Sequence, residues 1–179
     1  MKTIGIDVDS VLFPINEWVI IPAWARVGLP VKLEDITDFD YLKCLTPEHK
    51  QIAFRQFMRS DLYDGFRPTE VAMAALTLLR ERYRVIAVTS PFYQHAGSKW
   101  RFCQRAGFEH GDIILCGDKT LVNMDVLLDD RPKTLLALGP GKSMVFDRPW
   151  NRYQLYTHHR VYGWISVPAG LDHLLSGAG

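Results

Sequence analysis

The chain has 179 residues, and its 21 Lys and Arg residues nearly balance its 20 Asp and Glu residues, for a formal net charge of +1. This length is typical of one domain with a single buried core, and the 47% hydrophobic content excludes intrinsic disorder. The near-zero net charge argues against duplex DNA or an anionic membrane bound through bulk charge. Three cysteines without CxxC spacing, Cys44, Cys103 and Cys116, favour a reducing compartment. Because no apolar stretch has the length of a signal core or a membrane span, we expect a soluble, cytoplasmic protein.

Short apolar runs, each followed by a polar or small residue, recur along the chain and predict buried strands. They cover residues 3–7, 85–89, 113–116, 126–128 and 144–146. Between them, apolar residues repeat at helical spacing over 69–83, and a second helix is predicted over 98–106. Because strands and helices alternate, we expect an α/β fold with a parallel, doubly wound sheet.

Residues 16–67 interrupt this alternation. They contain no convincing apolar strand, and helices are predicted at 16–27 and 47–60. We therefore expect a small helical cap, inserted after the first strand and lying over its carboxyl end. Residues 1–15 and 68–179 would then form the core.

Polar residues follow several predicted strands, at the edge of a parallel sheet where ligands bind. They are Asp7 and Asp9, Thr89 and Ser90, Lys119, and Asp129 and Asp130. Two carboxylates about 4 Å apart repel by about 4 kcal/mol at an effective dielectric constant of about 20, so four of them in one crevice require a cation. Oxygen ligands suit Mg²⁺, and the hydroxyl and ammonium groups are donors for a phosphate. The set therefore predicts a phosphoryl site.

Each of these pieces also has a purely structural interpretation, since an Asp at the end of a strand is usually a turn or helix-cap residue. The functional interpretation is favoured by their conjunction in the order D-x-D, T-S, K and D-D, each at or near the end of a predicted parallel strand.

The segments that carry these residues resemble the haloacid dehalogenase superfamily of phosphatases. DVDSVL, VTS, Lys119 and LLDD correspond to its four motifs. More narrowly, TSPFYQHAGSKWRF followed by GDKTLVNMDVLLDDRP is similar to the 5'(3')-deoxyribonucleotidase family, in which a DKT lysine precedes a DDRP motif by this spacing. The similarity extends over about residues 2–150, and it implies a Rossmann-like, three-layer fold with a small cap.

The resemblance also implies a role for each position. Asp7 is the nucleophile that forms an aspartyl-phosphate, and Asp9 is the acid/base. The implied Mg²⁺ ligands are Asp7, Asp129 and, through its backbone carbonyl, Asp9, while Asp130 supports the metal shell. The implied phosphate ligands are Thr89, Ser90 and Lys119.

Chemical reasoning agrees with this assignment. A carboxylate attacks a phosphate when a cation and hydrogen-bond donors neutralise that phosphate. A second carboxylate two residues further on can protonate the leaving oxygen and then take a proton from water. Asp9 needs a raised pKa for the first step, and crowding by neighbouring carboxylates favours this, whereas the cation opposes it.

The sequence departs from the family pattern after the first motif. Ser10 stands where the family usually has Gly, and Phe13 and Pro14 stand where it has an Ala-Asp-Phe stretch. Ser10 is small enough for the turn, so the second departure concerns the nucleobase end of the pocket. Aromatic side chains of the cap are candidates for stacking on a base, at about 1–3 kcal/mol each, although aromatics at helical spacing are more often core. These candidates are Phe13, Trp18, Phe39 and Tyr41, with Trp24 and Phe57 considered beside them.

Four weaker signals remain. Lys99 is a supporting candidate, either a phosphate ligand or a solvated lysine on a helix face. His158 and His159 lack ligand spacing and are expected at the surface. Residues 139–142 (GPGK) predict a turn and not a nucleotide-binding loop. Residues 148–152 are interpreted as a surface loop, with a substrate contact as the alternative.

The sequence therefore predicts a Mg²⁺-dependent phosphomonoesterase that acts on (deoxy)ribonucleoside monophosphates. We expect a small-molecule substrate, no stable nucleic-acid complex and no membrane association, and a homodimer is left open. One alternative is a related phosphatase acting on another small phosphate ester or on a nucleic-acid 3'-phosphate. The other is a non-catalytic phosphate-binding module, which is disfavoured because the acidic residues and Lys119 are all present.

Overall fold

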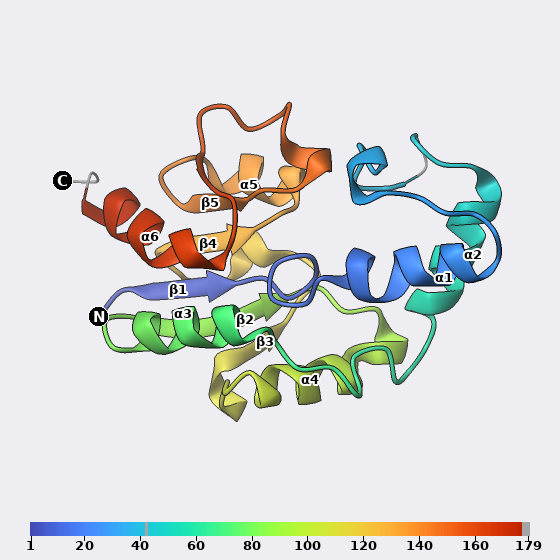
Figure 1. Cartoon of the computed structure of the whole chain (residues 1–179). Coiled ribbons are helices and arrows are strands. Elements are labelled where there is room, and N and C mark those ends of the chain that lie inside the picture. Colours follow the sequence, from blue (N-terminus) through green and yellow to red (C-terminus); the bar gives the residue numbers. More distant parts are fainter. Residues whose placement is uncertain (42, 177–179) are drawn as a thin grey trace.

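The computed structural model describes residues 1–41 and 43–176. Its centre is a six-stranded sheet in which neighbouring strands are parallel, in the order β3-β2-β1-β4-β5-β6 (Figure 1). The strands are β1 (Thr3–Ile6), β2 (Arg84–Thr89), β3 (Ile113–Leu115), β4 (Val126–Asp129), β5 (Ser143–Phe146) and β6 (His159–Val161). The predicted α/β fold is confirmed, and β6 is an additional strand whose sequence, HRV, is too short and too polar to be recognised as an apolar run.

The strand order reverses direction at β1. Ile4 is aligned with Val85 of β2 on one side and with Val126 of β4 on the other. From β1 the chain builds the sheet outward through β2 and β3, and it then returns to add β4, β5 and β6 on the opposite side. In such sheets a crevice opens beyond the carboxyl ends of the two strands that flank the reversal, which here are β1 and β4.

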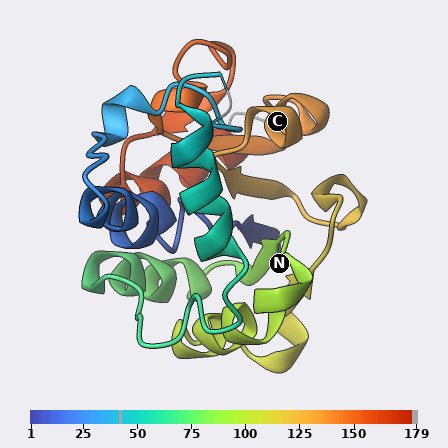
Figure 2. The ribbon, with the colours of Figure 1, turned by 90° about the vertical axis from the view of Figure 1, so that its right-hand side faces the viewer.

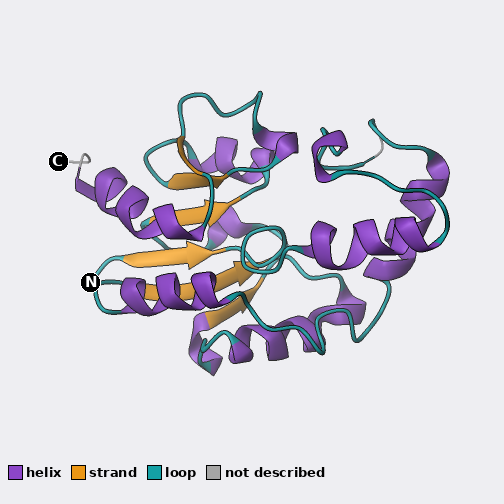
Figure 3. Cartoon of the chain, viewed as in Figure 1, coloured by secondary structure: helices purple, strands orange, loops and turns teal. Residues whose placement is uncertain are grey.

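Helices cover both faces of the sheet (Figure 3). They are α3 (Glu70–Arg80), α4 (Ala96–Arg105), α5 (Pro132–Leu138) and α6 (Val167–Ser176). One face packs Ile4 and Ile6 into the same buried cluster as Leu76 of α3, Phe102 of α4 and Leu171 of α6. The other face forms a second cluster, which Leu138 of α5 contacts. The predicted three-layer arrangement is therefore confirmed.

Gly5 marks how closely the second face is packed. A Cβ atom at this position would lie 2.5 Å from the Met124 sulfur and 3.1 Å from a Leu127 methyl group. Because Gly5 has no side chain, the segment before β4 can pack closely over the middle of the sheet.

Between β1 and α3 the chain forms helices that extend beyond the carboxyl ends of the strands (Figure 1). A π-helical turn (Asn16–Ile20) runs into α1 (Ile21–Arg26), and a 3₁₀ turn (Leu33–Asp35) precedes α2 (Pro47–Phe57). Viewed from that side, α2 crosses in front of the sheet (Figure 2). The buried Trp24 of α1 donates its indole N–H to the His49 carbonyl of α2 at 2.8 Å, which ties the two helices together. We use the term cap for residues 16–67.

Within the part of the chain that the structure describes, no helix combines the length and the apolar character needed to cross a bilayer.

Candidate active site

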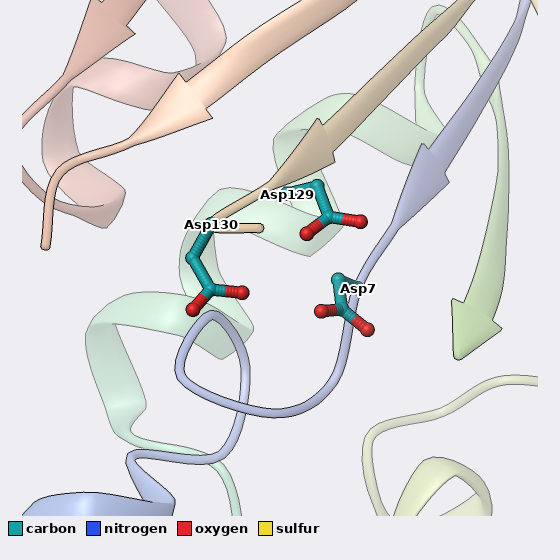
Figure 4. A group of neighbouring side chains, drawn as sticks. All are labelled: Asp7, Asp129 and Asp130. Atoms are coloured by element: carbon teal, nitrogen blue, oxygen red, sulfur yellow. The ribbon is translucent and has the colours of Figure 1, made fainter. Parts of the chain in front are cut away.

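Three aspartates meet where β1 and β4 end (Figure 4). Asp7 directly follows β1, Asp129 is the last residue of β4, and Asp130 comes next. Each offers one carboxylate oxygen, these oxygens lie within 4.8 Å of one another, and all three side chains are buried. The strand register brings them together, because the Asp7 amide donates a hydrogen bond to the Leu128 carbonyl at 2.9 Å.

The Lys119 ammonium joins two of these carboxylates. Its Nζ lies 2.7 Å from Asp7 Oδ1 and 2.7 Å from Asp129 Oδ2, and its side chain is buried. Burial alone would lower the pKa of Lys119, but the two carboxylates outweigh it and raise that pKa, so the ammonium stays charged. A short turn fixes its place in the chain, since Asp118 Oδ1 accepts a hydrogen bond from the Thr120 amide at 3.0 Å.

The aspartate cluster carries more negative charge than Lys119 balances. Burial raises the pKa of Asp7 to about 6, with Lys119 opposing this and the neighbouring carboxylates adding to it. Burial, followed by the charges of Asp129 and Asp7, also raises the pKa of Asp130 well above its ordinary value. A bound cation would favour the ionised form of these buried, crowded carboxyl groups and relieve their mutual repulsion.

The donor set fits a hard divalent cation such as Mg²⁺, because it consists of carboxylate oxygens. Asp7 Oδ2 accepts no hydrogen bond from the residues that the structure describes, so it remains available to a ligand. Asp129 is more fully engaged, with Oδ2 on Lys119 and Oδ1 accepting the Arg131 amide at 2.8 Å. The structure groups the Asp130 carboxylate with Asp7 and Asp129, whereas the Asp9 side chain lies outside this group.

Asp130 is held by residues that follow β5. The Trp150 indole donates to Asp130 Oδ2 at 3.0 Å, and the Asn151 side chain donates to the Asp130 carbonyl at 2.9 Å. Both side chains are buried. The expectation of a surface loop over residues 148–152 is therefore wrong at these two positions, because their polar atoms are required at the site edge. Arg152, in contrast, is exposed and pairs with Asp147.

Asp9 belongs to a different set of contacts. Its Oδ2 accepts from the Lys99 ammonium at 2.6 Å, and its Oδ1 accepts from the Tyr63 hydroxyl at 2.6 Å. Burial would raise the pKa of Asp9, but Lys99 and Tyr63 outweigh burial and lower that pKa. The expectation of a raised pKa is therefore wrong for the protein without ligands. Lys99 is fully buried, so its interpretation as a solvated lysine is wrong as well.

Two hydroxyl residues at the end of β2 contact Lys99: Thr89 is the last residue of the strand, and Ser90 follows it. Thr89 Oγ1 and the Ser90 carbonyl both accept from Lys99 Nζ, at 3.2 and 3.3 Å. The Ser90 hydroxyl oxygen is buried and has no hydrogen-bond partner among the described residues, and Ser90 lines the cavity above the aspartates. An unpaired buried hydroxyl at a cavity wall is a donor available to a bound ligand.

A cavity of about 710 Å³ lies between the cap and the carboxyl edge of the sheet. Asp7, Asp9 and Lys119 form part of its lining, and the cap contributes aromatic side chains. The volume is within the range of small-molecule sites, roughly 300–1,000 Å³. Its aromatic lining consists of Phe39, Tyr41, Phe54, Phe57, Phe92 and Trp150.

The predicted base-stacking candidates fall into two groups in the structure, those that line the cavity and those that do not. Phe39 and Tyr41 line the cavity. Phe13 is fully buried against Phe102 and Phe66, so the prediction that it contacts a base is wrong, because it is needed in the core. Trp18 stacks on Phe66 and is absent from the cavity wall, and Trp24, also considered, is buried between the cap helices.

Two cavity aromatics were missed by the sequence analysis. Phe92 follows Ser90 by two residues, so reasoning from strand ends would have found it, whereas Phe54 lies on α2 with no distinguishing pattern.

Among the weaker signals, the turn predicted at 139–142 is present, with Gly139 at φ 80° and its carbonyl accepting the Lys142 amide at 3.2 Å. His158 was expected at the surface, but it is buried and its Nε2 lies 3.1 Å from the Leu135 carbonyl. His159 is half-buried in β6.

Ser10 adopts a left-handed backbone conformation with φ 60°, which explains why glycine suits this position in the first motif. Here the serine is held by its neighbours. Its hydroxyl accepts from the Asn16 amide group at 3.4 Å, and its carbonyl accepts from Arg148 Nε at 2.6 Å. The turn that carries the chain from Asp9 into the cap is thus held at Ser10 by one residue of the cap and one residue that follows β5.

A parallel α/β sheet that gathers aspartates, a lysine and hydroxyl groups beneath an inserted helical cap defines the class of haloacid dehalogenase-like hydrolases. The fold agrees with a solved structure of this class, a haloacid dehalogenase-like family hydrolase from Xanthomonas campestris, with a TM-score of 0.59, 12% identity, and coverage of 100% of this chain and 98% of that one. More narrowly, the model of the 5' nucleotidase, deoxy (pyrimidine), cytosolic type C protein family matches residues 1–170, and the chain belongs to this family.

Curated relatives agree with this membership. A putative 5'(3')-deoxyribonucleotidase from Staphylococcus epidermidis is 27% identical over 170 residues, with 93% of each chain covered. The 5'(3')-deoxyribonucleotidase of Bacillus subtilis is 27% identical over 172 residues, which cover 93% of this chain and 96% of the relative. The predicted resemblance to a haloacid dehalogenase superfamily nucleotidase is confirmed.

Proposed function

We propose that the protein is a Mg²⁺-dependent phosphomonoesterase that releases phosphate from (deoxy)ribonucleoside monophosphates through an aspartyl-phosphate. The observation that carries this proposal is the Asp7 carboxylate at the end of β1, whose Oδ2 has no hydrogen-bond partner among the described residues and which lines the cavity. The printed names of the relatives supply the substrate class. The cation, held by Asp7, Asp129 and Asp130 and by the Asp9 carbonyl, would neutralise charge on the phosphate and orient it.

The residues of the chain then have distinct roles. An Asp7 oxygen attacks phosphorus as the ester P–O bond breaks, and Asp9 delivers a proton to the leaving oxygen. In the second half, Asp9 takes a proton from a water molecule that attacks the same phosphorus, which releases phosphate and regenerates the Asp7 carboxylate. Phosphate binding is assigned to the side chains of Ser90, Thr89 and Lys119, with Lys99 supporting them.

Lys99 links these two roles. In the unliganded protein its ammonium holds Asp9 as a carboxylate, at 2.6 Å, while also contacting Thr89. A bound phosphate competes for the same ammonium, because its oxygens are strong acceptors. Engagement of Lys99 by phosphate would free Asp9 Oδ2 and raise the pKa of Asp9 toward the value that a general acid needs.

The nucleoside end of the substrate is assigned to the aromatic part of the cavity. Phe39 and Tyr41 come from the cap, and Trp150, from the segment after β5, has its ring centroid 6.4 Å from that of Phe39. A base is a flat, apolar-faced group, and stacking on such side chains contributes about 1–3 kcal/mol per base in nucleic-acid binders.

The cytoplasmic location stays a prediction.

A panel of nucleoside monophosphates and sugar phosphates, assayed for phosphate release with Mg²⁺ and with EDTA, tests the proposal. We expect nucleotides to be the better substrates, EDTA to abolish turnover, and Asp7→Asn to be inactive. Asp172→Asn is the matched control, because this partly exposed carboxylate on α6 pairs with Arg82 away from the site. Preference for sugar phosphates would contradict the nucleotide assignment, and an active Asp7→Asn variant would contradict the mechanism.

A further inference from the structure

Tyr63 reaches Asp9 from the segment that returns from the cap to the core. This segment lies between the end of α2 at Phe57 and the start of α3 at Glu70. The Tyr63 side chain is fully buried, and its hydroxyl donates to Asp9 Oδ1 at 2.6 Å. The other oxygen of the same carboxylate is held by Lys99.

Packing, and not the hydrogen bond, fixes where the Tyr63 hydroxyl lies. The ring centroid is 4.7 Å from that of Phe13, 5.3 Å from that of His95 and 6.1 Å from that of Phe102. His95 is itself anchored, with Nδ1 3.0 Å from the Phe57 carbonyl and Nε2 accepting the Phe92 amide at 3.2 Å. The hydroxyl is therefore a fixed point, and the Asp9 carboxyl group adapts to it.

The two partners of Asp9 differ in what they can do when a proton moves. An ammonium only donates hydrogen bonds, so Lys99 binds the carboxylate and not a carboxylic acid O–H. A phenol both donates and accepts, so Tyr63 keeps its contact with Asp9 whether that group carries the proton or has given it up. In the proposed reaction Lys99 is also shared with phosphate, which leaves the phenol as the constant contact.

We propose that Tyr63 is a positioning residue that holds the Asp9 carboxyl group in one orientation through both proton transfers of the reaction. This rests on the proposed function, in which Asp9 protonates the leaving oxygen and then deprotonates water. The hydroxyl touches no reacting atom and acts only through Asp9. Its removal lets the carboxyl group rotate about its side-chain bonds, which reduces the fraction of bound substrate that is aligned for proton transfer.

The leaving group separates this role from a structural one. A nucleoside is a poor leaving group and needs a proton from Asp9, whereas p-nitrophenolate leaves without one. For Tyr63→Phe with magnesium present, we expect the single-turnover rate of nucleoside release from a deoxynucleoside monophosphate to fall roughly 10- to 100-fold, the size typical of losing one hydrogen bond to a charged group, with KM unchanged. We expect the single-turnover rate of p-nitrophenolate release from p-nitrophenyl phosphate to stay within about two-fold of the wild-type value, because proton donation assists that step little. Single-turnover release is compared because the later attack of water on the aspartyl-phosphate is the same step for both esters.

Two further proteins control the experiment. Tyr83→Phe removes a hydroxyl that donates to Asp172 at 2.8 Å, far along the chain from the site, and should leave both activities unchanged. Tyr63→3-fluorotyrosine keeps the hydroxyl and should retain the wild-type ratio of the two activities, and it also reports on the role if Tyr63→Phe folds poorly.

The outcomes are distinct. A selective loss with the nucleotide supports the positioning role. Equal losses on both esters in Tyr63→Phe, or no loss on either, overturn it while leaving the phosphatase assignment in place. A wild-type protein that hydrolyses neither ester overturns the proposed function, and this inference falls with it.

Discussion

Replacing Lys119 with Met removes the only ammonium that lies between Asp7 and Asp129 in the described structure, while keeping an unbranched side chain of similar length. The wild-type Nζ is 2.7 Å from each carboxylate, and all three side chains are buried. Breaking a buried ion pair by removing one partner typically costs about 3–5 kcal/mol, because the other charge is left without compensation. We expect a loss of that size in the free energy of unfolding at pH 7 in EDTA.

The pH dependence follows from the Asp7 carboxyl group. Its pKa is already raised to about 6 in the folded protein, and losing Lys119 raises it further. A carboxyl group with a folded-state pKa above its unfolded value binds more protons when folded, so it destabilises the protein as pH rises through that interval. The Lys119→Met variant should therefore regain stability relative to the wild type as pH falls from about 8 toward 6, below which the wild-type Asp7 takes up its proton as well.

Urea unfolding followed by tryptophan fluorescence measures both effects, with Lys142→Met as the control because Lys142 is exposed and makes no ion pair among the described residues. A ligand that binds only the folded state stabilises it by mass action. Magnesium should therefore stabilise both proteins, and Lys119→Met more than the wild type, because no ammonium compensates the carboxylates in the variant. A variant as stable as the wild type in EDTA at pH 7 would refute the view that Lys119 holds the acidic cluster together.

Three other perturbations have defined outcomes. Burial, with Lys99 adding to it, lowers the pKa of His95, so the unfolded chain takes up its proton first and stability should decline as pH falls below about 6.5; His95→Asn should show a smaller decline in acid titrations of stability. Phe39→Ala should raise KM for a nucleotide by roughly 5- to 100-fold, as expected for losing one stacked base, and leave KM for deoxyribose 5-phosphate unchanged in phosphate-release assays. Gly5→Ala should destabilise the protein by about 1–3 kcal/mol in urea melts, since the new methyl group would lie 2.5 Å from the flexible Met124 side chain; an unchanged midpoint would show that Met124 moves aside freely.

The sheet could be predicted from sequence because its strands are buried on both faces. Continuous apolar runs such as residues 85–89 and 126–128 carry that signal directly, and the polar residues that end them locate the carboxyl edge. The same reasoning misses β6, because its outer position allows His159 and Arg160 to remain partly exposed. The local sequence pattern therefore predicts the central strands of the sheet but not the edge strand β6.

The acidic cluster was also accessible to sequence reasoning, since each aspartate lies within two residues of a strand end. Lys119 was accessible as well, but the hydrogen-bond partners of Asp9 and Asp130 from distant segments were not. Tyr63 is 54 positions from Asp9 along the chain, and Trp150 is 20 positions from Asp130. Each contact exists because separate segments pack against the same edge of the sheet, and no spacing in the sequence encodes such packing.

The pKa of Asp9 shows the same limit in energetic terms. The sequence reveals nearby carboxylates, which would raise the pKa, but not that Lys99 on α4 points inward and pairs with Asp9 at 2.6 Å. Burial is the largest single influence on this pKa, but Lys99, together with Tyr63, outweighs it and reverses the direction of the shift.

The two edge strands of the sheet affect how copies of this chain can associate. Its outer strands, β3 and β6, have only three residues each, and Arg160 of β6 pairs with Asp147 at 2.8 Å. Edge strands this short, one of them also charged, offer few free backbone groups to a strand from another molecule, which is how native sheets resist growing into fibres. Edge-to-edge pairing of sheets between copies is therefore disfavoured, and association through helices, loops or the cap would leave each sheet separate.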